Sequence, residues 1–173
     1  LASTAMVLSA RGGRQSRVYL HNNRLWYLED RNPEPRSPEE SLLVSVALDG
    51  TDRREHLIFG AAEEFAISPD FTKVAYKSKH SVYLTALPPW PTGAALETLP
   101  VQSLTETWGE GLHWSPDGKT IFWMEGPQRH GLAIESIHVL KEDEKPAVPT
   151  TETISVQLPR ARPEGVIALT HAR

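Results

Sequence analysis

A repeated Ser-Pro-Asp triplet constrains the fold of this chain more than any other feature of its sequence. One copy, Ser68-Pro69-Asp70, lies between the strand-like stretches 64–67 and 73–76. The other, Ser115-Pro116-Asp117-Gly118, lies in the same way between 111–114 and 120–123, and the two triplets are 47 residues apart. Each copy has the pattern of a strand, a tight turn and a second strand. A repeat of this period, built from short strands, is typical of a fold made of successive small sheets.

The tetrapeptide Ser-Pro-Asp-Gly has the composition of a tight hairpin turn. Pro116 fixes φ at about −65°, Asp117 accepts the third turn position, and Gly118 supplies a positive φ at the fourth. A type I turn followed by a bulge at the glycine is a common hairpin connection. Phe71 stands where the other copy has Gly118, and a bulky residue at positive φ is strained. We therefore expect the turn at 68–71 to differ in conformation or length.

The spacing of strands and turns predicts an all-β fold, a partial β-propeller of three to four four-stranded blades. The propeller region is expected to span residues 1–158, with blades at about 16–60, 61–106 and 107–158. The first blade lacks the triplet, but the Asn22-Asn23 pair tolerates positive φ and predicts a hairpin there. Asp49-Gly50 is a second hairpin signal in the same blade. Residues 30–40 contain three prolines and are expected to form a surface loop.

Further strands are expected at 3–10, at 97–104, at 132–140 and at 151–158. In the stretch 97–104, Pro100 marks an exposed edge. In 151–158, the apolar residues alternate with polar ones and share one side. Large aromatic residues are expected in the core between the sheets, because they bury the most apolar area. These residues are Trp26, Tyr76, Trp114 and Trp123.

The composition excludes several kinds of partner and chemistry. The net charge is −4, with no long run of one sign, and this argues against a nucleic-acid partner, which would need a basic face. The chain has no cysteine, so disulfides and thiolate chemistry are excluded. No apolar run approaches the roughly 20 residues of a membrane-spanning helix, so no membrane span is expected.

The sequence predicts no catalytic, cofactor-binding or metal-binding residues. Asp70 and Asp117 are interpreted as turn formers, since no cluster of the kind that binds calcium accompanies them. The glycines at 12–13 and 109–111 lack the spacing of a phosphate-binding loop, and no Ser/His/Asp arrangement is evident. His113 lies on an expected inner strand, where it is the candidate for a channel-lining residue. A structural role in packing is the interpretation that we favour for it.

The segments around the triplets resemble the TolB-like, WD-type propeller repeats, whose signature is an apolar strand, Ser-Pro-Asp-Gly, a basic or polar pair and another apolar strand. Residues 64–70, 81–84 and 109–120 are further similar to the last blades of a propeller fused in front of an amidohydrolase domain. The tail 158–173 resembles the junction into that domain. The resemblance covers 60–173 well and 1–60 loosely. It implies a linker and the first strand of a downstream domain at 159–173, and a periplasmic or secreted protein.

Amidohydrolase chemistry, as the resemblance implies it, needs a His-x-His pair on a barrel strand, further histidines and an Asp. None of the seven histidines of this chain forms His-x-His. The catalytic residues of that family therefore have no counterpart here. No enzyme activity is expected of this chain alone, although the parent protein could be a metal-dependent amidohydrolase.

The number of blades predicts association. At about 47 residues each, 173 residues make between three and four blades, whereas propellers close with about four to eight. An open ring would expose two apolar sheet faces, so we expect a second copy, or further polypeptide, to complete it. Two functions follow. The chain is either a non-catalytic scaffold or access gate in a larger amidohydrolase-like protein, or a stand-alone TolB-like protein-interaction module.

Overall fold

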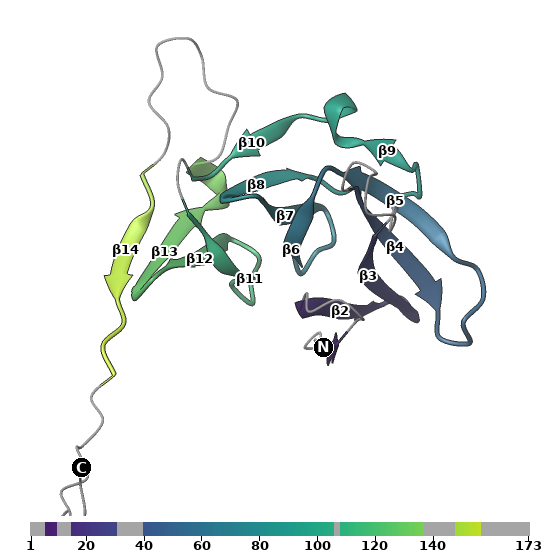
Figure 1. Cartoon of the computed structure of the whole chain (residues 1–173), viewed down its shortest axis with the longest axis horizontal. Coiled ribbons are helices and arrows are strands. Elements are labelled where there is room, and N and C mark those ends of the chain that lie inside the picture. Colours follow the sequence, from purple (N-terminus) through teal and green to yellow (C-terminus); the bar gives the residue numbers. More distant parts are fainter. Residues whose placement is uncertain (1–5, 10–14, 31–39, 106–107, 137–147, 157–173) are drawn as a thin grey trace, which may run out of the picture.

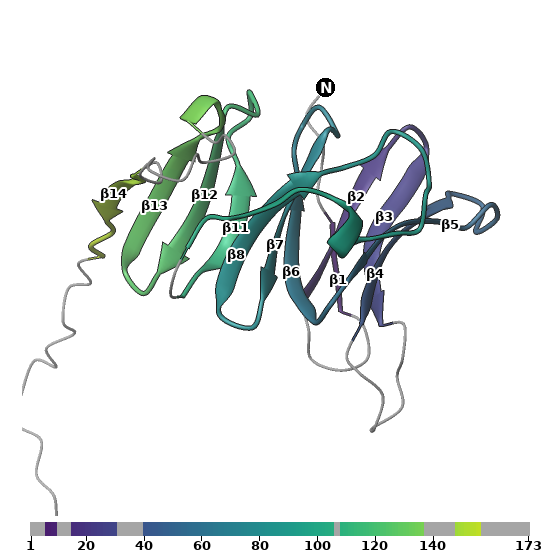
Figure 2. The ribbon, with the colours of Figure 1, turned by 90° about the horizontal axis from the view of Figure 1, so that it is seen from above.

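The computed structural model describes residues 6–9, 15–30, 40–105, 108–136 and 148–156, which form an all-β structure. Their strands make three sheets, of six, four and four strands. Apart from two 3-10 turns, Leu96–Thr98 (η1) and Ile134–Ser136 (η2), these residues contain no helix. Figure 1 shows the sheets side by side in a fan, and Figure 2 shows the same ribbon from above. The tail at 159–173, expected to be a linker and a strand, lies outside the described residues.

The first sheet has the strand order β1-β2-β3-β4-β5-β9. Its strands are β1 (Met6–Ser9), β2 (Gln15–His21), β3 (Arg24–Asp30), β4 (Ser41–Ala47), β5 (Arg54–Phe59) and β9 (Ala94–Ala95). The β2–β3 hairpin turns at Asn22 and Asn23, whose φ angles of 49° and 57° agree with the expected tolerance of asparagine for this region. The strand β9 comes from a later part of the chain and pairs in parallel with β5. Residues 31–39 of the expected loop lie outside the described residues.

The second and third sheets are antiparallel, with the orders β10-β8-β7-β6 and β11-β12-β13-β14. The second contains β6 (Ala62–Ile67), β7 (Lys73–Ser78), β8 (Ser81–Ala86) and β10 (Val101–Ser103). The third contains β11 (Glu110–Trp114), β12 (Thr120–Glu125), β13 (Gln128–Ala133) and β14 (Thr150–Thr153). In both sheets the Ser-Pro-Asp turn connects the first strand to the second, as the repeat predicts.

Three of the expected strands differ in the structure. The strand expected at 97–104 is only β10, because η1 occupies the residues before Pro100, which has no N–H to donate to a ladder. Of the strand expected at 132–140, residues 137–140 lie outside the described residues; the strand found there, β13, begins already at Gln128, because Gly126 (φ 56°) turns the hairpin earlier, and it ends at Ala133. The strand expected at 151–158 ends at Thr153. Beyond it Ile154 and Val156 are exposed, and Leu158 lies outside the described residues.

The two Ser-Pro-Asp turns have the same conformation, so the expected difference between them is wrong. In each turn the N–H of the fourth residue donates to the Ser carbonyl, at 2.9 Å for Phe71 to Ser68 and 2.9 Å for Gly118 to Ser115. In each turn the Ser hydroxyl also donates to the Asp carboxylate, at 2.6 Å. Phe71 adopts a φ of 56°, close to the 70° of Gly118. The bulky residue therefore takes the glycine conformation.

Contacts with the first sheet explain why Phe71 tolerates a positive φ. Its ring stacks on His21, with centroids 3.6 Å apart, and meets Trp26 edge-on at 5.4 Å. The left-handed region costs an L-residue about 1 kcal/mol. The apolar contacts of the ring offset this cost. The residue that breaks the sequence pattern of the turn thus connects the second sheet to the first.

Two apolar cores lie between the three sheets. The core between the first and second sheets contains buried residues from both: Trp26, Leu43, Leu57, Phe59, Phe65, Ile67, Val74 and Tyr76, among others. The core between the second and third sheets contains Ala66, Ala75, Val82, Leu84, Leu112, Ile121, Trp123 and Leu132. Of the four aromatic residues expected in the core, Trp26, Tyr76 and Trp123 are buried and Trp114 is half-buried.

The strands β2, β6 and β11 lie on one side of the fan, and β6 contacts both β2 and β11 (Figure 1). Each is the strand that enters the tight turn of its sheet. Sheets that pack face to face, with such inner strands on a common side, are the blades of a propeller. The chain is therefore a partial β-propeller, and its described residues do not close a ring.

We predict that Phe71→Gly lowers the free energy of unfolding by about 1–2 kcal/mol. Glycine would remove backbone strain of about 1 kcal/mol. It would also remove the ring that packs on His21 and Trp26, and burying such a ring contributes about 2–3 kcal/mol. Urea denaturation measures the difference.

Gly118→Ala is the matched substitution in the other turn. It adds strain at a φ of 70° and places a Cβ 3.3 Å from Cδ of Pro69, without removing a ring. We expect it to cost about 1 kcal/mol. A Phe71→Gly variant more stable than the unmodified chain would contradict the role assigned to the ring.

Candidate functional site

The inner strands meet at a group of polar contacts that we call the central cluster: Arg17, Glu64, Gly111 and Leu112. The strand β11 is interrupted by a bulge, where Gly111 takes a φ of 66°. The Glu64 carboxylate of β6 accepts two successive backbone N–H groups there, from Gly111 at 2.9 Å and from Leu112 at 2.8 Å. Successive N–H groups of this kind form a concavity that binds anions. Here the anion is a side chain of the neighbouring sheet.

Arg17 of β2 brings the first sheet into the central cluster. Its guanidinium lies 3.4 Å from the Glu64 carboxylate and donates a hydrogen bond to the carbonyl of Leu112. The Arg17 and Glu64 side chains are 29% and 18% exposed, so water screens this ion pair less than a pair at the surface. One carboxylate and one guanidinium thus connect the inner strands of all three sheets.

Two aromatic side chains donate hydrogen bonds to β6 beside the central cluster. The Tyr19 hydroxyl, from the first sheet, donates to the carbonyl of Phe65 at 3.4 Å, and burial raises the pKa of this phenol. The Trp114 indole N–H, from the third sheet, donates to the carbonyl of Ala66 at 2.9 Å. The middle inner strand therefore accepts a hydrogen bond from each of its neighbours on adjacent carbonyl groups.

His113 is on β11, the inner strand of the third sheet. Its ring stacks on Phe122 with centroids 5.1 Å apart, and its Nδ1 lies 2.9 Å from the carbonyl of Gly111. Because a carbonyl only accepts, Nδ1 carries the proton. These contacts give the half-buried ring a packing role next to the central cluster. Its role as a channel-lining residue stays a prediction.

The central cluster is not predicted from the sequence above. Glu64 and Gly111 occupy the same position in the two copies of the repeat, and the side chain of one copy binds the backbone of the other. The signal was a charged residue on a strand expected to be inner, at the position where the other copy has a glycine. A residue-by-residue alignment of the two copies would have singled out this pair, although not Arg17.

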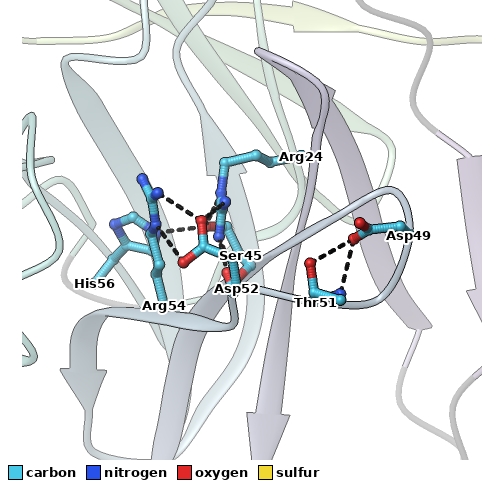
Figure 3. A network of polar contacts seen from close by, with 7 residues as sticks. All are labelled: Arg24, Ser45, Asp49, Thr51, Asp52, Arg54 and His56. Atoms are coloured by element: carbon cyan, nitrogen blue, oxygen red, sulfur yellow. Dashed lines mark hydrogen bonds and ion pairs between the residues drawn. The ribbon is translucent and has the colours of Figure 1, made fainter.

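A serine and a histidine form a second polar site, inside the first sheet (Figure 3). The hydroxyl of Ser45 lies 2.8 Å from Nε2 of His56 and accepts a hydrogen bond from Nε of Arg24 at 2.9 Å. A Ser–His pair at this distance is the geometry of an activated nucleophile. However, Ser45 is 0% and His56 4% exposed, so no substrate can reach the hydroxyl. In addition, Nδ1 of His56 has no hydrogen-bond partner in the described structure, so no acidic group orients the ring.

Burial and positive charge keep His56 neutral. Desolvation by burial, together with the positive charges of Arg24 and Arg54, lowers the pKa of His56 to about 4. The ring stacks on Trp26 with centroids 4.0 Å apart. The pair is therefore a neutral structural element of the first sheet.

An exposed carboxylate holds the two arginines beside this pair (Figure 3). Asp52 accepts from Arg24 at 2.7 Å and from Arg54 at 2.5 Å, and these hydrogen bonds lower the pKa of its carboxyl. In the neighbouring turn Asp49 accepts from the N–H and hydroxyl of Thr51, which lowers the pKa of Asp49 in the same way. The carboxylates of Asp49 and Asp52 thus hold the conformation of the β4–β5 turn.

No three His, Asp or Glu side chains gather in the described ranges in a way that could hold a metal ion. The structure, in the part of the chain that it describes, also contains no helix long and apolar enough to span a membrane.

No protein-family model matches the chain, and no curated protein matches it. Among solved structures, the chain is similar to the β-propeller domain of the Trilobed protease from Pyrococcus furiosus, which is described as having an open velcro topology. The TM-score is 0.39 and the sequence identity 20%. The match covers 83% of this chain and 43% of that one. The assignment as a partial propeller rests on the sheets and inner strands of this chain itself.

We predict that Glu64→Gln lowers the free energy of unfolding by about 2 kcal/mol. The amide keeps one acceptor oxygen, but it loses the charge that Arg17 faces and presents an NH₂ group to a backbone N–H. Urea denaturation at neutral pH measures the loss.

Glu55→Gln is the control, because Glu55 is also a strand glutamate paired with an arginine. Its partner is Arg53 at 2.7 Å, but the two side chains are 47% and 40% exposed. We expect this variant to lose less than about 0.5 kcal/mol. Equal losses in the two variants would show that the central cluster is no stronger than a surface ion pair.

We predict that the stability of the fold falls between pH 7 and pH 4 because of His56. Its pKa is 6.5 in the unfolded chain and about 4 in the fold, so the unfolded state binds more protons in this range. The stabilisation from the neutral ring is complete above pH 6.5 and is lost as the pH falls toward 4, by about 3 kcal/mol. Urea titrations at several pH values measure this slope. His56→Gln should show a shallower slope, and an unchanged slope would contradict the assignment.

Proposed function

We propose that the chain is a non-catalytic segment of a β-propeller that acts as a scaffold, and that further blades complete its ring. The observation that supports this proposal is the face of the third sheet directed away from the second sheet. We call it the terminal face and define it by His113, Phe122, Met124 and Arg129. A polar and apolar mixture of this kind is typical of surfaces that bind another protein.

Strand alternation places these residues on one side of the third sheet. Ile121 and Trp123 of β12 belong to the core against the second sheet, so Phe122 and Met124 project from the opposite side. The Arg129 guanidinium lies 4.3 Å from the centre of the Phe122 ring. Opposite Phe122 on β13 is Gly131, where an added Cβ would be 2.7 Å from the ring. The ring therefore lies flat on the sheet, in close contact with backbone.

The terminal face resembles the faces that are already covered in this chain. The covered face of the second sheet also receives aromatic and aliphatic side chains from its neighbour, and polar contacts accompany them at the inner strands. The four residues of the terminal face are only half-buried. A flat aromatic ring held between a histidine and an arginine suits a further sheet better than it suits water. The occupant that we propose is a blade from a second copy or from adjoining polypeptide.

The finer part of the proposal is that the scaffold belongs to an amidohydrolase-like protein and gates access to its active site. It is supported by the resemblance at residues 64–70, 81–84 and 109–120, and a periplasmic or secreted location is proposed on the same ground. The coding sequence beyond Arg173 tests it. A barrel with a His-x-His strand supports the proposal, and a stop codon directly after Arg173 contradicts it.

A stand-alone interaction module is the second candidate function. The observation in its favour is the exposure of two tryptophans, Trp90 at 64% and Trp108 at 41%. Tryptophan is enriched at the energetic centres of protein interfaces. In that case the partner would be a different protein.

We predict that the chain associates in solution and that Phe122→Glu weakens this association. A carboxylate on the terminal face would have to be desolvated when another sheet covers it, which costs several kcal/mol. Light scattering and sedimentation of the chain, from micromolar to millimolar concentration, measure the effect.

Leu48→Glu is the matched control, because Leu48 is an apolar residue 57% exposed in the β4–β5 turn, far from the third sheet in sequence. It should leave the association unchanged. A monodisperse monomer at all concentrations, or equal weakening by both substitutions, would contradict the proposed role of the terminal face.

A further inference from the structure

A cavity of about 530 Å³ lies where the first and second sheets meet. It is bordered by the segment that connects β8 to β10, residues 87–100, which we call the strap. The strap leaves the second sheet, pairs with β5 of the first sheet as β9, and returns through η1 to the edge strand β10 (Figure 1). At its start the Leu87 N–H donates to the carbonyl of Thr72 at 2.8 Å, and at its end Thr85 donates to the carbonyl of Pro100 at 3.0 Å. Both ends of the strap are therefore fixed.

Five of the eight residues that line this cavity are aromatic or aliphatic, and the others add polar groups. Tyr76 and Tyr83 on adjacent strands stack with ring centroids 5.3 Å apart and an angle of 22° between the planes. The strap adds Leu96 and Leu99, and β10 adds Val101, which is 40% exposed. Nearly parallel rings beside branched side chains favour a flat apolar ligand. The volume is within the range of sites for small molecules, about 300–1,000 Å³.

Lys79 supplies the charge of the cavity. The neighbouring Lys77 is neutralised by Glu63, at 3.2 Å, and lies over the ring of Trp108. In contrast, Lys79 has no acidic partner among the described residues, and none of the residues that line the cavity is acidic. An unpaired ammonium group next to a half-apolar cavity complements an anion, and a planar carboxylate matches it best at this size.

The hairpin turn between β7 and β8 fixes the backbone at Lys79. Lys79 has a φ of 58° in the two-residue turn between β7 and β8, a conformation that favours glycine and costs a lysine about 1 kcal/mol. Phe71 offsets the same cost with ring contacts, but Lys79 is exposed and makes no such contact. A two-residue hairpin turn needs a positive φ at its first position, so the turn itself holds the lysine in place beside the cavity.

We propose that this cavity binds a small organic carboxylate with a flat apolar body, the ring stacking on Tyr83 and the carboxylate pairing with Lys79. The residues that line the cavity belong to the second sheet, the strap and the link at Gly60, so completion of the ring at the terminal face leaves the site in place. The inference is therefore independent of the proposed scaffold function. It adds a ligand site to a chain in which the buried Ser45–His56 pair offers none.

Indole-3-acetate and its neutral analogue indole-3-acetamide are suitable probes, because they share a flat body and differ in charge. Calorimetry and ligand-observed NMR at low salt on the 173-residue chain compare their affinities. We expect the carboxylate to bind at least tenfold more tightly than the amide. Lys79→Gln should remove this difference without changing the affinity for the amide, and Tyr83→Leu should weaken both probes.

Lys119→Gln is the matched control, since Lys119 is an exposed lysine next to the other tight turn, and it should leave both affinities unchanged. Lys79→Gly should lose the preference for the carboxylate while its melting temperature stays equal or rises, since glycine relieves the strain. Failure of both probes to bind at millimolar concentration, equal affinities for the two, or equal effects of Lys79→Gln and Lys119→Gln would overturn the proposal. A lower melting temperature of Lys79→Gly would assign the lysine a structural role and also overturn it.

Discussion

The contact between the Glu64 carboxylate and the N–H groups of Gly111 and Leu112 determines how the sheets of this chain meet. Apolar packing drives the sheets together, but it has no direction and tolerates sliding and rotation. A carboxylate that accepts hydrogen bonds from two fixed N–H groups prevents sliding and rotation, because both distances are short only in one relative placement of the sheets. Arg17 extends the same constraint to the first sheet. The fan of sheets is therefore set at its inner strands, and the cores between the sheets fill the space that these strands define.

The repeat was predictable because its signals are local. Ser115, Pro116, Asp117 and Gly118 specify a turn by their own conformational preferences, and the flanking alternation specifies two strands. The same local rule failed at Phe71, where contacts with His21 and Trp26 override the preference of the residue. It failed again at the strap, because the pairing of β9 with β5 joins residues that are distant in sequence. Local residue preferences thus predicted the strands and turns. They failed where contacts between sheets determined the conformation.

The polar sites were not predictable for a related reason. Glu64 reads as a surface residue of a strand until its partner 47 residues later is known. Ser45 and His56 are 11 residues apart on two strands whose register has a bulge, so their meeting depends on a shift that the sequence does not show. Conversely, the search for His-x-His required only neighbouring residues and could be made from the sequence alone. Motifs within one strand are visible in a sequence, whereas sites assembled across strands need the register.

Burial separates the two kinds of polar site in this chain and assigns them different functions. The Ser45–His56 pair has the distance of a catalytic pair, but the sheet encloses it, and desolvation keeps its imidazole neutral. Lys79 has the opposite character, since it is exposed, charged and placed at the edge of a cavity. A protein interior stabilises neutral, satisfied groups, whereas recognition needs a charge that stays available until the ligand arrives. Both functions proposed for this propeller segment therefore lie at its surface, namely the terminal face for further blades and the cavity under the strap for a small anion.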